Sequence, residues 1–199
     1  MQTKQEITPF ARRLGKLAAA CAIALVASQA NAELVTNGGF ETGDLSGWTQ
    51  FGNTGFTGVT TSSFYVHSGI DGAFFGPVGS TGGISQTLAT TPGATYHIEF
   101  WLSNGGGTTT SFAWHWGGAT PAPSFSNSGG FGMTQFTADL VATAATTTIS
   151  FEFRQDPSFW GLDDVSVNQT GTPVPEPVSL GLLAAGGLAF AGARRRSRA

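Results

Sequence analysis

The central part of the chain predicts an all-β fold, an antiparallel β-sandwich, on three observations. Gly, Thr and Ser dominate it, and β-branched and aromatic residues come in short runs. Turn signals such as Asn-Gly, Pro-Gly and Gly-Gly separate these runs at intervals of about ten residues. No stretch has an apolar stripe at helical spacing. We therefore expect one sandwich domain over residues 33–170.

The longest predicted strand covers residues 95–102, where Ile98, Phe100 and Leu102 share one face and Tyr96 is expected to break the pattern. Thr91-Pro92-Gly93 predicts a turn into it, because Pro fixes φ and Gly permits a positive φ. Further strands are predicted at 59–66, 84–88, 112–116, 134–141, 146–153 and 162–167.

Most of the tryptophans are predicted to lie in the core. Trp114 and Trp116 alternate with smaller or polar residues and share a face with Phe112. Aromatic residues in such a pattern are more often core than ligand platform. Trp48, which follows a glycine, is expected in the core as well.

The N-terminal residues 1–32 have the order of a secretory signal peptide. Four basic residues within the first sixteen precede an apolar run at 17–27 and the small-residue site Ala30-Asn31-Ala32. The alternative is an ordinary N-terminal helix, but the apolar run is too short to span a bilayer. Cleavage after Ala32 would make Glu33 the mature N-terminus.

The C-terminal residues predict a membrane anchor. A Pro-rich linker at 171–177 contains Pro175-Glu176-Pro177, an apolar stretch follows at 178–193, and 194–199 form a basic tail. A helix over the apolar stretch would rise roughly 24 Å, a little less than the hydrocarbon core of a bilayer, and arginines that snorkel could cover the gap. The basic tail would stay cytoplasmic, so the central domain would face outward. A plain tail anchor is the alternative.

This C-terminal pattern resembles the PEP-CTERM sorting signal of exported proteins in Gram-negative bacteria. The resemblance rests on Pro175, Glu176 and Pro177, the Gly/Ala-rich apolar stretch and the terminal arginines. It implies an exosortase-type enzyme as partner, a transient inner-membrane anchor, and then a place at the cell surface or in the extracellular matrix. It implies a destination and no activity.

Charge argues against nucleic acid as a partner. Residues 33–172 hold ten acidic residues and one basic residue, Arg154, which gives a net charge near −9. Such a surface repels phosphate backbones. The one cysteine, Cys21, lies in the predicted signal peptide, so the domain is expected to have no disulfide.

We expect no enzyme. The chain has three histidines and no Gly-x-Ser-x-Gly elbow, and residues 33–170 contain no cysteine. Asp163 and Asp164 are the closest pair of carboxylates, but neighbours on a strand point to opposite faces and cannot flank one glycosidic bond.

The acidic residues at the two ends of the domain are candidate metal ligands. Glu41 follows Asn37-Gly38-Gly39-Phe40, and Asp163 is expected on the buried face of the last strand with Val165 and Val167. A buried carboxylate needs a partner, which could be calcium, backbone donors from a loop, or Arg154. The predicted calcium ligands are Glu41, Asp163, Asp164 and, as a weaker candidate, Asp71.

The same motifs resemble the galactose-binding-like jelly roll of many carbohydrate-binding modules. The resemblance covers nearly the whole domain, from the Asn37–Glu41 motif and Gly47-Trp48, through Pro92–Tyr96 and Phe100-Trp101, to Leu162–Val167. It implies a structural calcium held by Glu41 and Asp163, and a polysaccharide as ligand.

Sugar binding needs an exposed aromatic face beside polar groups. Trp101 lies opposite Phe100 and Leu102 on its strand, so we expect it to point outward with His97 and Glu99. Trp160, in a predicted loop, is a further candidate for the ligand site. The other aromatic and polar candidates are Phe74, Phe75 and His115.

The sequence therefore predicts an exported, non-catalytic, calcium-stabilised domain that binds carbohydrate, with exopolysaccharide as ligand. The alternative is a structural or adhesive component of an extracellular matrix or biofilm, without a discrete sugar site. An exposed tryptophan beside polar groups would favour the first hypothesis.

Overall fold

A computed structural model describes residues 33–171, which form strands and loops and contain no helix. No helix that could cross a membrane is found among these residues. The predicted signal peptide and its cleavage site, the Pro-Glu-Pro motif, the sorting helix and the basic tail lie outside them.

Ten strands make up the described part of the chain. They are β1 (Thr49–Gly52), β2 (Thr57–Thr60), β3 (Gly72–Phe75), β4 (Gly82–Ala89), β5 (Thr95–Asn104), β6 (Thr110–Trp116), β7 (Phe125–Ser126), β8 (Phe131–Val141), β9 (Thr146–Gln155) and β10 (Trp160–Gly171).

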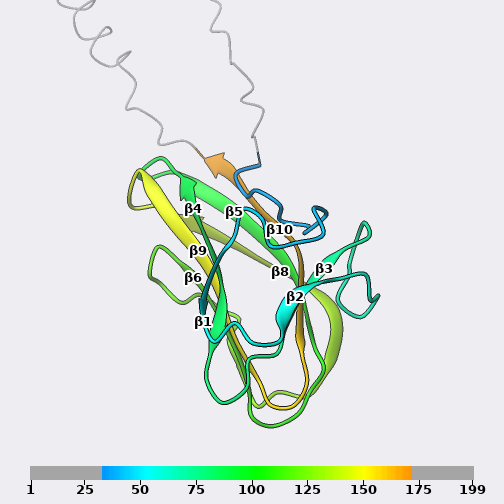
Figure 1. Cartoon of the computed structure of the whole chain (residues 1–199). Helices are drawn as coiled ribbons and strands as arrows, with labels where there is room; N and C mark the ends of the chain where they lie inside the picture. Colours follow the sequence, from blue (N-terminus) through cyan, green and yellow to red (C-terminus); the bar gives the residue numbers. More distant parts are fainter. Residues whose placement is uncertain (1–32, 172–199) are drawn as a thin grey trace, which may run out of the picture. The chain divides into compact units, whose positions relative to one another are not determined.

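These strands form two five-stranded antiparallel sheets, in the orders β1-β4-β9-β6-β7 and β2-β3-β10-β5-β8. The chain moves repeatedly from one sheet to the other, as Figure 1 shows. The predicted all-β sandwich is confirmed. β10 lies between β3 and β5, so the last strand of the domain is central in its sheet and not at an edge.

Aromatic rings from both sheets fill the core. Phe100 of β5 meets Trp114 of β6 and Phe151 of β9 with ring centroids 5.3 and 5.2 Å apart. Phe75 of β3 stacks on Phe153 of β9 at 4.1 Å. Rings at these distances add edge and stacking attraction to the burial of apolar area, which is the main force holding the sheets together.

Tyr96 corrects one detail of the predicted longest strand. It is 1 % exposed and lies on the same buried face as Ile98 and Phe100. Its hydroxyl accepts a hydrogen bond from the Thr91 amide at 2.8 Å and donates one to Gln169 at 3.2 Å. The ring therefore follows the period of the strand, because its polar end finds partners at the edge of the core.

The predicted turn before β5 is present. Pro92 and Gly93 occupy its two central positions, Gly93 has a φ of 81°, and the Ala94 amide donates to the Thr91 carbonyl at 3.0 Å. A positive φ at the third position of the turn is the reason that Gly stands there.

The prediction of a strand at 59–66 is wrong for most of these residues. β2 ends at Thr60, and residues 61–71 form a loop. The Tyr65 amide turns back to the Ser62 carbonyl, and the aromatic residues of the loop pack on the outer face of a sheet rather than pairing in it. The short strands β1, β3 and β7 were not predicted.

A β-bulge in β10 reverses the predicted orientation of Asp163. The pairing with β5 runs regularly to Asp163 opposite Trp101 and resumes at Ser166 opposite Glu99, with Asp164 at a φ of 46° between them. The extra residue shifts the alternation of the strand. Asp163 therefore shares the outer face with Trp101, whereas Val165 and Val167 are core residues.

Candidate functional site

The loop of residues 61–71 covers part of the outer face of the β2-β3-β10-β5-β8 sheet. The Ser103 hydroxyl of β5 donates to the Phe64 carbonyl at 3.0 Å. Tyr65 packs against Phe74 of β3 and Phe159, with ring centroids 6.3 Å away in both cases. The first half of the loop, which contains Phe64 and Tyr65, thus packs over the start of β10. The second half of the loop reaches the middle of the sheet.

Asp163 lies beneath this loop with no exposed surface. Its Oδ2 accepts hydrogen bonds from the amides of His67 at 2.7 Å and Ser68 at 3.2 Å, and its Oδ1 accepts one from the amide of Asp164 at 2.8 Å. Burial raises the pKa of this carboxyl to about 6, and the three N–H donors oppose that shift. Backbone donors are thus the partners of this buried acid.

Glu41 holds the other end of the same loop. Its Oε1 accepts hydrogen bonds from the amides of Ile70 at 2.9 Å and Asp71 at 3.1 Å. Gly69 sits between the two held ends at a φ of 70°, where a Cβ atom would collide with the Glu41 carboxylate. Two carboxylates from the ends of the domain therefore fix one loop through its N–H groups.

The four acids predicted as calcium ligands do not gather into one metal centre. Within residues 33–171, no group of three or more His, Cys, Asp or Glu side chains could share a metal ion. Calcium needs six to eight oxygen ligands, whereas the loop turns N–H donors toward Glu41 and Asp163. Asp164 is occupied by other partners, and the contacts of these residues do not support the calcium prediction.

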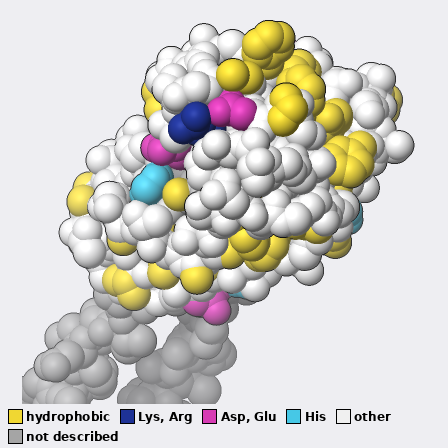
Figure 2. Space-filling view, turned by 90° about the horizontal axis from the view of Figure 1, so that it is seen from below, with side chains coloured by type: hydrophobic (Ala, Val, Ile, Leu, Met, Phe, Trp, Pro, Cys, Tyr) yellow, Lys and Arg dark blue, Asp and Glu magenta, His cyan; other side chains and the backbone are white. Residues whose placement is uncertain are grey.

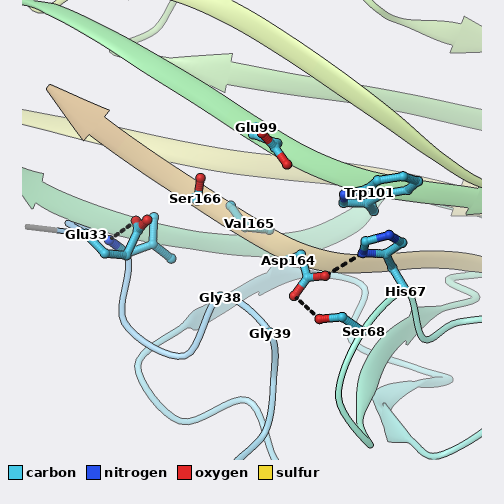
Figure 3. A pocket seen from close by; sticks show the side chains of 11 residues that line it. Glu33, Gly38, Gly39, His67, Ser68, Glu99, Trp101, Asp164, Val165 and Ser166 are labelled. Carbon is cyan, nitrogen blue, oxygen red and sulfur yellow. Dashed lines mark hydrogen bonds and ion pairs between the residues drawn. The ribbon is translucent and has the colours of Figure 1, made fainter. Parts of the chain in front are cut away.

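His67 stacks on Trp101 and is held there by Asp164. The two rings lie 3.4 Å apart with an interplanar angle of 9°. His67 Nδ1 and Asp164 Oδ2 are 2.6 Å apart, and because an ionised carboxylate only accepts, Nδ1 carries the hydrogen and donates it. The Ser68 hydroxyl donates to Asp164 Oδ1 at 3.0 Å. Asp164 thus orients the imidazole, and Figure 3 shows its carboxylate linked to both the His67 ring and the Ser68 hydroxyl.

A shallow groove of about 350 Å³ opens beside this stacked pair, between the loop and the N-terminal segment 33–39. Side chains that line it include Glu33, His67, Glu99, Trp101, Asp164 and Ser166. Figure 3 shows Glu99 and Trp101 on β5 and Ser166 on β10, along one side of the groove. The segment opposite is fixed because Glu33 accepts from the amides of Val35 and Val167 at 3.0 and 2.8 Å.

Several polar groups in the groove have no partner within residues 33–171. The Glu99 carboxylate, the Ser166 hydroxyl and the Trp101 indole N–H make no hydrogen bond there, although Glu99 and Trp101 are half-buried. Polar groups left open around an aromatic ring can receive the hydroxyl groups of a ligand. The arrangement is suited to binding.

The groove has three acidic side chains in its lining and no Lys or Arg. Glu33, Glu99 and Asp164 contribute these carboxylates. Arg154, the one Lys or Arg in residues 33–171, belongs to β9 in the other sheet and forms an ion pair with Asp156 at 2.8 Å. On the face shown in Figure 2, the basic group likewise lies beside acidic ones on a mostly uncharged surface.

The structure separates the residues predicted for the ligand site. Trp101 and Glu99 come together in the groove, as expected from their shared face. His97 lies on the same face but outside the groove lining, and its Nδ1 pairs with Asp139 at 2.8 Å. Trp160 is fully buried and donates its indole N–H to the Arg154 carbonyl at 3.1 Å, so its proposed role as a ligand platform is wrong.

The remaining aromatic residues are placed as follows. Trp48, Trp114 and Trp116 are core residues, as predicted. Phe75 is buried, and Phe74 lies half-buried under the 61–71 loop. His115 is on the other sheet.

Sequence reasoning missed His67 and Ser68. Both directly follow the segment predicted as a strand at 59–66, and nothing in the pattern placed them over β5. The available signal for a loop was the long segment between Thr60 and the Gly-rich turn at 69–72. Asp164 was named, but as a metal ligand and not as the partner of a histidine.

Comparison with known proteins shows the fold. No protein-family model and no curated protein matches the sequence. Among solved structures, a CBM61 module in complex with β-1,4-galactotriose is 19 % identical with a TM-score of 0.55, and the match covers 69 % of this chain and 99 % of that one.

Two further structures give the same result. The CBM22-1-CBM22-2 tandem domain of Xyn10C from Paenibacillus barcinonensis is 16 % identical with a TM-score of 0.53, covering 76 % of this chain and 48 % of that one. The K3 cleaved adhesin domain of Lys-gingipain from Porphyromonas gingivalis is 17 % identical with a TM-score of 0.51, covering 69 % and 98 %. The chain therefore has the jelly-roll sandwich fold found in carbohydrate-binding modules.

Proposed function

We propose that this domain binds carbohydrate, without catalysing its conversion, in the groove between the 61–71 loop and segment 33–39. The observation that carries the proposal is Trp101, a half-buried indole beside the unpartnered Glu99 and Ser166. All the other tryptophans of residues 33–171 are in the core.

The stacked pair of Trp101 and His67 would give a sugar ring an apolar surface. The C–H face of a sugar packs on such a surface, and its hydroxyl groups donate to the Glu99 carboxylate or exchange hydrogen bonds with Ser166. Because Asp164 and Ser68 hold the imidazole in place, the surface is formed before the ligand arrives, which lowers the entropy lost on binding.

The geometry gives no support to hydrolysis. The Ser68 hydroxyl donates to Asp164, so it is not activated by His67, and among the described residues no hydroxyl is bonded to His67 Nε2.

We further propose that the domain acts outside the cytoplasm. The predicted signal peptide and the resemblance to the PEP-CTERM tail support this step. An exosortase-type enzyme would then be the sorting partner, the inner membrane a transient anchor, and an exopolysaccharide at the cell surface or in the matrix the natural ligand.

Calorimetric titration of the full-length chain in mild detergent, with β-1,4-galactan, xylan and other neutral oligosaccharides, tests the proposal. We expect Trp101→Ala to weaken binding at least about 5-fold, because an aromatic anchor commonly contributes more than 1 kcal/mol. Phe56→Ala is the matched control, since Phe56 is an aromatic residue 68 % exposed and outside the groove. Equal loss in both variants, or no binding of any sugar, would contradict the proposal.

A second candidate function is a structural or adhesive matrix component. The observation in its favour is a set of apolar side chains exposed on the loops between β1 and β4, namely Phe56, Phe64, Ile70 and Val78. Exposed apolar groups favour self-association. Sedimentation of the chain over a range of concentrations tests this alternative, and Phe56→Ser and Ile70→Ser should reduce any association that is found.

A further inference from the structure

Glu99 has no cationic neighbour. Its partners across the sheet are Thr137 of β8 and Ser166 of β10, and the next outward residue of its strand, His97, is already paired with Asp139. The Glu99 carboxylate is half-buried and makes no hydrogen bond or ion pair within residues 33–171. A half-buried carboxylate that no described residue pairs with is open to a cation from outside.

The neighbouring ring adds to the preference for a cation. Trp101 follows Glu99 by two residues, so both side chains leave the same face of β5 and line the same groove. An indole attracts a cation to its π face, and a carboxylate beside it attracts the same cation by charge. The pair thus favours a ligand with a positively charged group.

The rest of the groove would repel a negatively charged ligand. Glu33 and Asp164 lie on the same lining as Glu99, and none of the lining residues is Lys or Arg. An acidic sugar bound here would bring one more carboxylate close to these three, with no Lys or Arg side chain to balance it.

We propose that Glu99 makes this groove selective for polysaccharides whose sugar units carry a free amino group, and that Glu99 weakens the binding of uronic acids. The ammonium group of the sugar pairs with the Glu99 carboxylate, while the sugar ring packs against Trp101 and His67. This inference rests on the proposed function, because it specifies the ligand of the same groove.

Three oligosaccharide series of equal length serve as probes: β-1,4-linked glucosamine, its N-acetylated form and oligogalacturonate. Each is titrated calorimetrically into the full-length chain in mild detergent, at low and at high salt. We expect the glucosamine series to bind at least about 5-fold more tightly than the N-acetylated series at low salt, with a smaller difference at high salt. We expect oligogalacturonate to bind most weakly.

The variant Glu99→Gln should abolish the preference for the glucosamine series over the N-acetylated series. Glu152→Gln is the matched control, because Glu152 is a half-buried acid on β9 of the other sheet. A preference that survives Glu99→Gln, or that Glu152→Gln removes equally, would overturn the inference while carbohydrate binding stands. If none of the three series binds and neutral hexose oligomers do, the inference fails alone; if no sugar binds at all, the proposed function fails with it.

Discussion

Asp163 receives all three of its hydrogen bonds from backbone N–H groups, and it has no exposed surface. A carboxylate in this position joins the last strand of the domain to a loop about a hundred residues earlier in the chain. The residue types alone predicted that Asp163 would be buried and would need a partner. They did not identify the partner, because the loop amides that approach it carry no sequence signal.

The titration of Asp163 should make the free energy of unfolding of the domain depend on pH. Its pKa rises from 3.8 to about 6 on folding, mainly because burial disfavours the charged form. Between these values the folded state keeps a proton that the unfolded state has released, so the free energy of unfolding falls as pH rises. Below 3.8 and above about 6 this group contributes no slope.

Urea unfolding of the wild type and of Asp163→Asn across that pH interval measures the effect. We expect the variant to lose the downward slope, since an amide does not titrate there. Asp139→Asn is the control, because the Asp139 side chain is 65 % exposed and pairs with His97 only. An unchanged slope in Asp163→Asn would mean that other groups carry the pH dependence.

At the scale of elements, the 61–71 loop decides the shape of the site. It connects β2 to β3 and carries His67 onto Trp101, and its second half is fixed by Asp163 and then by Glu41. Without this loop the outer face of β5 and β10 would be flat. The groove therefore depends on the hydrogen bonds that the Glu41 and Asp163 carboxylates accept from the loop.

Glu41→Ala should loosen the second half of the loop. The amides of Ile70 and Asp71 lose their acceptor, and we expect their hydrogen exchange to rise at least about 5-fold, since each hydrogen bond contributes roughly 1 kcal/mol. Exchange in β9, on the other sheet, should stay the same. Glu41→Gln keeps an oxygen acceptor and is expected to behave like the wild type. Equal exchange rates in Glu41→Ala would show that the loop does not depend on this carboxylate.

The elements that sequence predicted well are those with regular alternation. β5, β6 and β9 alternate buried and less buried residues over seven or more positions, and their buried faces follow directly from period two. β10 follows the same rule until the bulge at Asp164, which no residue pattern marks. The β-branched and aromatic residues at 59–66 misled the prediction, because such a run does not distinguish a paired strand from a loop segment that packs on a sheet.

At the scale of the whole molecule, the described domain is held by packing and hydrogen bonds. The chain's one cysteine lies outside the described residues. Aromatic rings from both sheets meet across the core, and Glu41 and Asp163 hold the 61–71 loop through hydrogen bonds. The candidate site thus stands on a rigid sheet on one side and on a hydrogen-bonded loop on the other, which suits binding more than large movement.

Thermal unfolding of the full-length chain with calcium and with a chelator tests whether calcium or backbone N–H groups are the partners of Glu41 and Asp163. A ligand that binds only the folded state must raise the unfolding midpoint. We expect no calcium-dependent rise, because the loop directs N–H groups and not carbonyl oxygens at Glu41 and Asp163. A rise that Glu41→Ala abolishes would contradict this expectation. It would mean that the loop reverses its peptide groups to supply oxygen ligands, and that calcium, rather than backbone amides, fixes the wall of the groove.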